Sequence, residues 1–85
     1  MQINELIENR LNEKFPNKTI KMLMEVDPIS FHPFHRLAVD GRQTSFGFDH
    51  EAMVREITIH GTTFGEYADK FVENVSKGME LGHTL

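Results

Sequence analysis

Hydrophobic positions repeat with a helical period at both ends of the chain. The first stripe consists of Ile3, Leu6, Ile7, Leu11 and Phe15. These intervals of three and four residues predict an amphipathic helix, which ends before Pro16 because proline disfavours helical geometry in the preceding residue. The second stripe consists of Phe64, Tyr67, Ala68, Phe71, Val75 and Met79. This stripe predicts a closing helix. Thr63 and Glu66 have the spacing of a capping box and mark the start of that helix.

Between the stripes the period changes to two, which is typical of half-buried strands. Residues 19–26 predict one strand, with Ile20, Met22, Met24 and Val26 on its apolar side. Residues 35–40 predict a second strand. Asp40-Gly41 favours a two-residue hairpin turn, in which both central positions take positive φ. The turn specifies a third strand over residues 42–48.

The hairpin also predicts a register. With a type I′ turn at residues 40–41, Val39 faces Arg42 and His35 faces Phe46.

Residues 49–60 have two interpretations. Asp49-His50-Glu51 indicates a turn, and residues 53–60 then form a fourth strand with Ile57 and Ile59 facing inward. The β-branched run Ile57-Thr58-Ile59 favours this interpretation. The alternative is a short helix capped by Asp49. We expect the strand.

These elements predict one α+β domain over residues 1–85. Its order is a helix, a three- to four-stranded antiparallel sheet and a helix, with both helices on one face of the sheet. A chain of 85 residues is too short for two ordinary domains.

Composition narrows the class of protein. Hydrophobic residues at 39% and charged residues at 26% are typical of globular domains, and the lack of cysteine excludes disulfides and thiolate metal sites. The start of the chain lacks the features of a signal peptide, and no apolar run approaches the roughly 20 residues of a membrane span. We therefore expect a cytoplasmic protein with no membrane partner.

The net charge of -4 disfavours a general nucleic-acid binder, because that role needs clustered lysine and arginine. The element order is also that of double-stranded RNA-binding domains, which place lysines at the start of the last helix. Here residues 62–69 are acidic, so we expect no direct nucleic-acid partner. Opposite charge favours a basic protein surface instead.

The connection over residues 27–34 contains two prolines and concentrates the apolar side chains of Ile29, Phe31 and Phe34. They either pack back against a helix or contact a partner, since exposed aromatic residues are typical interface anchors. The candidate partner-binding residues are Ile29, Phe31, His32 and Phe34.

Histidines suggest a second kind of site. His32, His35, His50 and His60 could form a metal or acid-base centre, and Asp49, His50, Glu51 and His60 could converge at one hairpin. Pro33 between His32 and His35 makes their spacing poor for a shared helix face. We therefore predict no metal, no cofactor and no catalytic residue.

Self-association is a third possibility, because a sheet edge offers unpaired backbone groups. The apolar stretch Met22-Leu23-Met24 could provide the contact in a homodimer.

Three segments resemble small acidic phage-encoded anti-CRISPR inhibitors of type II nucleases. They are Met1-Gln2-Ile3-Asn4-Glu5-Leu6-Ile7, Val39-Asp40-Gly41 and Phe71-Val72-Glu73-Asn74-Val75-Ser76-Lys77-Gly78. The resemblance implies a non-enzymatic protein that occupies a basic nucleic-acid site on its target. The chain departs from that pattern by its low net charge and its lack of a dense acidic tract. The prediction is a small protein-binding module, encoded by a phage or mobile element, that inhibits a host nucleic-acid-handling defence protein.

Overall fold

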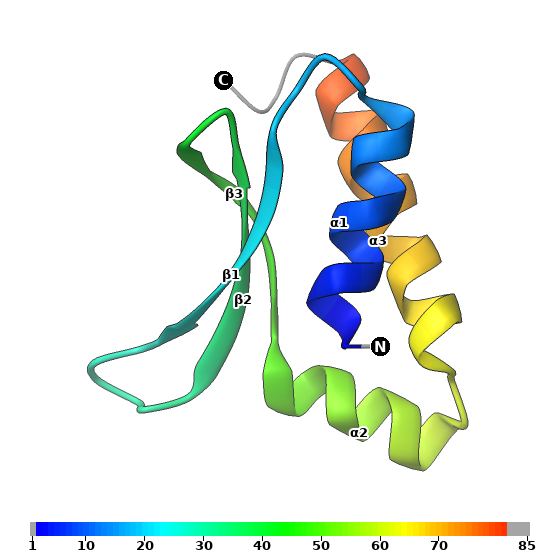
Figure 1. Ribbon diagram of the computed structural model, residues 1–85. Coiled ribbons are helices and arrows are strands. Elements are labelled where there is room, and N and C mark those ends of the chain that lie inside the picture. The colour runs from blue at the N-terminus through cyan, green and yellow to red at the C-terminus, as the bar shows by residue number, and fades with distance from the viewer. Residues whose placement is uncertain (1, 82–85) are drawn as a thin grey trace.

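A computed structural model describes residues 2–81, which form three helices and one antiparallel sheet (Figure 1). In chain order the elements are α1 (Ile3–Lys14), β1 (Ile20–Val26), β2 (Pro33–Val39), β3 (Arg42–Asp49), α2 (His50–His60) and α3 (Phe64–Glu80). No helix among the described residues is long and apolar enough to cross a membrane.

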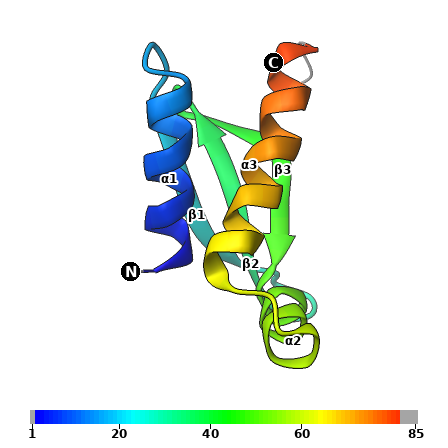
Figure 2. The ribbon, with the colours of Figure 1, turned by 90° about the vertical axis from the view of Figure 1, so that its right-hand side faces the viewer.

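The strands lie in the order β1-β2-β3, and each pairs antiparallel with the next. Helices α1 and α3 lie side by side on one face of this sheet, and α2 runs across one end of it (Figures 1 and 2). The predicted α+β class, with the first and last helices on one face, is confirmed.

Most residues of the predicted apolar stripes form the core between the helices and the sheet; Val72 joins them without having been predicted, and Phe64 is 49% exposed instead. The buried residues on the helices are Ile3, Ile7 and Leu11 of α1 and Ala68, Val72 and Val75 of α3. Those on the sheet include Ile20, Met22, Leu37, Val39 and Phe48. The side chain of Thr63 accepts a hydrogen bond from the amide of Glu66 at 3.1 Å, which confirms the predicted start of α3.

The expected fourth strand is wrong, because residues 50–60 form helix α2. Asp49 accepts a hydrogen bond from the amide of Ala52 at 3.0 Å, and Gly61 ends the helix in the left-handed region at φ 69°. The hydroxyl of Thr58 donates to the carbonyl of Val54 at 2.6 Å within the helix. Caps at both ends therefore outweigh the weak β propensity of the branched residues.

The hairpin turn is confirmed, since Asp40 and Gly41 have φ of 53° and 81°. The register near the turn also holds, with Val39 opposite Arg42. Farther along it shifts, and His35 pairs with Phe48 rather than with Phe46 as predicted. Two additional residues on β3 account for the shift, so the sequence between Gln43 and Gly47 forms a bulge.

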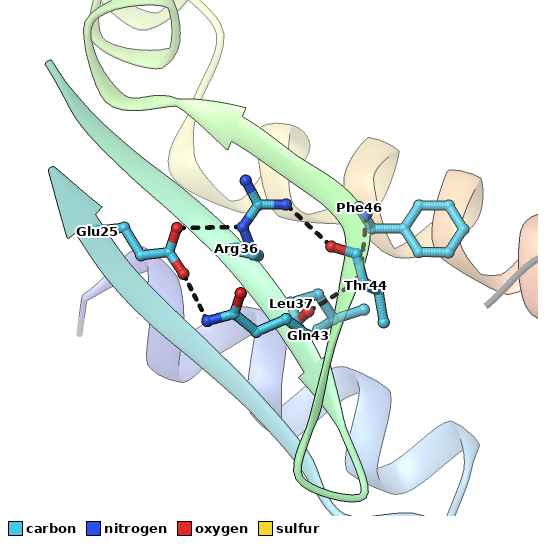
Figure 3. Close-up of polar contacts among 6 residues, drawn as sticks. All are labelled: Glu25, Arg36, Leu37, Gln43, Thr44 and Phe46. Atoms are coloured by element: carbon cyan, nitrogen blue, oxygen red, sulfur yellow. Dashed lines mark hydrogen bonds and ion pairs between the residues drawn. The ribbon is translucent and has the colours of Figure 1, made fainter. Parts of the chain in front are cut away.

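Side-chain hydrogen bonds explain how the bulge is tolerated (Figure 3). The hydroxyl of Thr44 donates to the carbonyl of Leu37 at 2.9 Å and accepts from the amide of Phe46 at 3.1 Å. Arg36 donates to the carbonyl of Thr44 at 3.0 Å. The ring of Phe46 packs against Gly78 of α3 so closely that any Cβ at that glycine would overlap it. Threonine thus replaces ladder hydrogen bonds that the bulge interrupts.

Candidate functional site

The connected ends of β1 and β2 project beyond the helices, at the lower left of Figure 1. We call residues 24–34, which include the loop between these strands, the hairpin end. Ile29 is 90% exposed and Phe31 is 76% exposed, so neither packs back against a helix. Of the two interpretations of this connection, the structure agrees with a surface loop that presents apolar side chains.

Hydrogen bonds within the loop order it. The amide of Phe31 donates to the carbonyl of Asp27 at 2.7 Å, and the amide of Asp27 donates to the carbonyl of His32 at 3.0 Å. The carboxylate of Asp27 also accepts from the amides of Ile29 at 2.8 Å and Ser30 at 3.3 Å. These two backbone hydrogen bonds hold the pKa of Asp27 below its ordinary value. The backbone that carries the exposed side chains of Ile29 and Phe31 is therefore held in one conformation by hydrogen bonds.

Phe34 differs from Ile29 and Phe31, because it is half buried within the sheet. Its ring covers Gly47, and the guanidinium carbon of Arg36 lies 5.1 Å from the ring centroid. Phe34 thus belongs to the outer face of the sheet, opposite the helices. It packs within the sheet at the border of the hairpin end and is less available to a partner than Ile29 and Phe31.

A polar network lies beside this ring on the same face (Figure 3). Arg36 of β2 donates to Glu25 of β1 at 3.1 Å, and Gln43 of β3 donates to the other oxygen of Glu25 at 2.8 Å. The network connects all three strands and neutralises Glu25.

An open hollow of about 510 Å³ lies between the loop and the end of β3. Val26, Ile29 and Phe34 give it an apolar side, and Asp27 and Asp49 give it an acidic side. The hairpin end therefore combines exposed apolar groups with carboxylates.

His32, the remaining candidate partner-binding residue, lies beside two carboxylates rather than beside His35. Its Nδ1 atom is 4.0 Å from Oδ2 of Asp49 and 3.7 Å from Oε2 of Glu51. The ligand atoms of these three residues all lie within 4.8 Å of one another. Imidazole and carboxylate donors at this spacing could hold a metal ion.

His35 is buried on the inner face of β2, which faces the helices, opposite to the face that carries Phe34 and Arg36. Its Nδ1 lies 2.6 Å from Oδ1 of Asn4, and its Nε2 lies 2.8 Å from Nδ1 of His50. Burial first, and the nearby charge of His50 second, lower the pKa of His35 to about 4. His35 is therefore neutral at physiological pH.

The hydrogen-bond partners assign the proton positions of this pair. The side-chain oxygen of Asn4 only accepts, so His35 donates from Nδ1 and accepts at Nε2. The partner at Nε2 is then the Nδ1–H of His50, which leaves Nε2 of a neutral His50 with its lone pair. An open, mostly apolar hollow of about 380 Å³, lined in part by Met24 and Met53, includes both rings in its wall.

The four histidines do not form one centre. His32 lies on one side of the sheet and His35 with His50 on the other. His60 ends α2, ten residues after His50, which corresponds to about 15 Å of helix rise. Asp49, His50, Glu51 and His60, which the sequence allowed to converge, do not all meet, because the first three lie at the start of α2 and His60 at its end.

Sequence reasoning missed the contacts of His35 with Asn4 and His50 and that of His32 with Glu51. The contacts with His50 and Glu51 depend on the register shift in β3 and on α2, which the strand interpretation of residues 53–60 did not include. The Asp49 to Ala52 cap was the available signal for α2.

Compared with known proteins, the chain matches no family model, no curated protein and no solved structure. Its function is therefore inferred from the geometry of its surface.

Proposed function

We propose that this chain is a small non-enzymatic protein-binding module that docks onto its partner through the hairpin end. The observation that carries the proposal is the conformation of Phe31. This residue has a φ of 59° while its side chain is 76% exposed.

A bulky residue in the left-handed region is strained, at roughly 1 kcal/mol or more, and such strain clusters at functional positions. In the free protein the exposed ring makes few packing contacts, so packing offsets little of this backbone strain. Ile29, at 90% exposed, adds a second apolar group on the same loop. Insertion of both side chains into an apolar pocket of a partner would bury them, and buried aromatic residues are typical anchors of interfaces.

The charge around these anchors indicates the partner's chemistry. Asp27 lies in the hairpin end and Asp49 and Glu51 lie beside it, whereas Glu25 is already paired with Arg36. Carboxylates at the rim of an apolar contact favour a pocket bordered by lysine or arginine, because opposite charge speeds encounter.

A host nucleic-acid-handling protein would offer such a basic surface. Inhibition of a protein of that class, with phage or mobile-element origin, stays a prediction here. It is supported by the acidic rim and by the resemblance of the sequence segments to anti-CRISPR inhibitors.

A quantitative pull-down tests the proposed surface. We would use as baits the unmodified chain, Phe31→Asn, Ile29→Ser and the control Ile59→Gln, and identify retained proteins by mass spectrometry. Asparagine tolerates the left-handed region, so Phe31→Asn removes the ring and preserves the loop. Ile59 is a matched control, since it is 67% exposed but lies on α2.

The expected result is one protein retained by the unmodified chain and by Ile59→Gln, and lost with both hairpin variants. Its retention should fall as salt increases, because rim charges are screened. A partner retained equally by all four baits would show that the hairpin end is not the contact surface.

Self-association is the second candidate, favoured by exposed Leu23 and Met24 on β1, an edge strand of the sheet. Light scattering over a range of protein concentrations tests it. A constant monomer mass would exclude a homodimer, and a dimer lost in Met24→Lys would support one.

A further inference from the structure

We infer that His32, Asp49 and Glu51 form a binding site for a divalent transition-metal ion, with Zn²⁺ as the ion to test. The site adjoins the apolar contact proposed for Phe31 and Ile29 and shares Asp49 and Glu51 with its acidic rim, but zinc binding does not depend on that function.

Strand pairing brings the three residues together. Phe34 of β2 pairs with Asp49, the last residue of β3, so His32, two residues before Phe34, lies beside the first turn of α2, which carries Glu51. The bulge creates this arrangement, because the unshifted register would leave Phe34 opposite Gly47. The ligands thus come from two chain segments that the sheet holds side by side.

Distances between the donor atoms are close to those of a metal site. Nδ1 of His32 lies 3.7 Å from Oε2 of Glu51 and 4.0 Å from Oδ2 of Asp49. Donors at the usual zinc distances of about 2.0–2.1 Å in tetrahedral geometry are separated by roughly 3.3 Å. Small side-chain rotations would therefore bring all three donors into coordination.

Two of the ligands are positioned by other hydrogen bonds. Oδ1 of Asp49 accepts from the amide of Ala52 at 3.0 Å, which turns the other oxygen toward His32. The carbonyl of His32 accepts from the amide of Asp27 at 3.0 Å, and its amide donates to the hydroxyl of Ser30 at 3.4 Å. Such outer contacts orient metal ligands and strengthen binding.

Charge and exposure also suit a cation. Two carboxylate side chains supply negative charge for a cation and outweigh the partial positive charge at the start of α2 close by. The side chains of His32, Asp49 and Glu51 are 51%, 39% and 52% exposed, so an ion can enter and water can complete its coordination. Three protein ligands with an open position are typical of zinc sites that are not purely structural.

The donor set selects among ions. Imidazole is a poor ligand for Mg²⁺ and Ca²⁺, which prefer oxygen, and the absence of thiolate leaves nitrogen and oxygen donors that suit Zn²⁺ and its first-row neighbours. Bound there, the ion would connect the loop that presents Phe31 to the first turn of α2.

The test is calorimetric titration of the purified chain, made without a histidine tag, with ZnCl₂ and separately with MgCl₂. The variants are His32→Gln, Glu51→Gln and Asp49→Asn, of which the last retains an oxygen for the helix cap. The matched controls are His60→Gln on α2 and Glu5→Gln on α1, both outside the cluster. Circular dichroism verifies that each variant is folded.

We expect one Zn²⁺ per chain for the unmodified protein and for both controls. His32→Gln, Glu51→Gln and Asp49→Asn should each weaken binding by about tenfold or more. Zn²⁺ should also slow amide exchange in residues 27–32, because the ion fixes the loop to α2.

Failure of the unmodified chain to bind Zn²⁺ would overturn the inference, and so would unchanged binding in His32→Gln and Glu51→Gln. Loss of binding in His60→Gln would place the ion elsewhere. Equal affinity for Mg²⁺ would contradict the assignment of a transition metal.

Discussion

The two halves of β1 carry the same alternation of side chains but lie in different surroundings. Ile20 and Met22 are 1% and 7% exposed, whereas Met24 and Val26 on the same apolar side are 52% and 59% exposed. Helix α1 covers the first half, and the second half continues beyond it (Figure 1). Alternation therefore identifies the face of a strand but not how far its cover extends. The uncovered half is where apolar surface remains for a partner.

A matched pair of side-chain truncations in β1 tests this difference between its two halves, and it has the largest expected effect. Ile20→Ala leaves a cavity in the packed half and should lower the free energy of unfolding by about 2–5 kcal/mol. Val26→Ala removes an exposed side chain and should change it by less than about 0.5 kcal/mol. Urea denaturation of both variants measures the difference. Equal losses would mean that the hairpin end is covered in solution.

Much of the packed part of the molecule, where α1 and α3 lie on the sheet, could be predicted from the sequence, because local sequence signals and burial agree there. The stripe of α1, the cap at Thr63 and the Asp40-Gly41 turn each specify an element without help from distant residues. The region around α2 could not be predicted in the same way. Ile57-Thr58-Ile59 favours a strand, and the helix exists because Asp49 and Gly61 cap it.

The candidate site was predictable in part. The position of Ile29 and Phe31 in a loop follows from the flanking prolines, but their exposure depends on where α1 begins relative to β1. The neighbours of His32 and His35 depend on the bulge at Thr44, whose hydrogen bonds to Leu37 and Phe46 have no separate sequence signal. Side-chain chemistry in this site therefore requires the three-dimensional register.

The second prediction concerns His35, which lies at the boundary between the two halves and faces Met24 across the strands. Its pKa is about 4 in the folded protein and about 6.5 when unfolded, so the unfolded chain binds more protons between these values. Stability should therefore fall as pH decreases from about 6.5 to 4. At about 1.4 kcal/mol per pKa unit, the loss from this residue does not exceed about 4 kcal/mol.

Urea denaturation across this pH range checks the prediction, with His35→Leu and the control His60→Gln. The charged or polar groups that face His35 are Asn4, His50 and Asp49, and all remain in both variants. His35→Leu should be less stable at pH 7 but should lose less stability on acidification than the control does. Parallel pH profiles of the two variants would show that His35 titrates normally in the folded chain.

The smallest expected effect is at Phe31 in the exposed half. Phe31→Gly and Phe31→Ala remove the same ring, but only glycine adopts the φ of 59° without strain. Phe31→Gly should therefore be more stable than Phe31→Ala by about 1 kcal/mol, the reverse of the usual order within helices and strands. Urea denaturation of the two variants measures the sign. A more stable Phe31→Ala would mean that the loop does not hold the left-handed conformation. A loss well above 1 kcal/mol in both variants would mean that the ring packs within the chain, so the aromatic side chain would serve the fold rather than a partner.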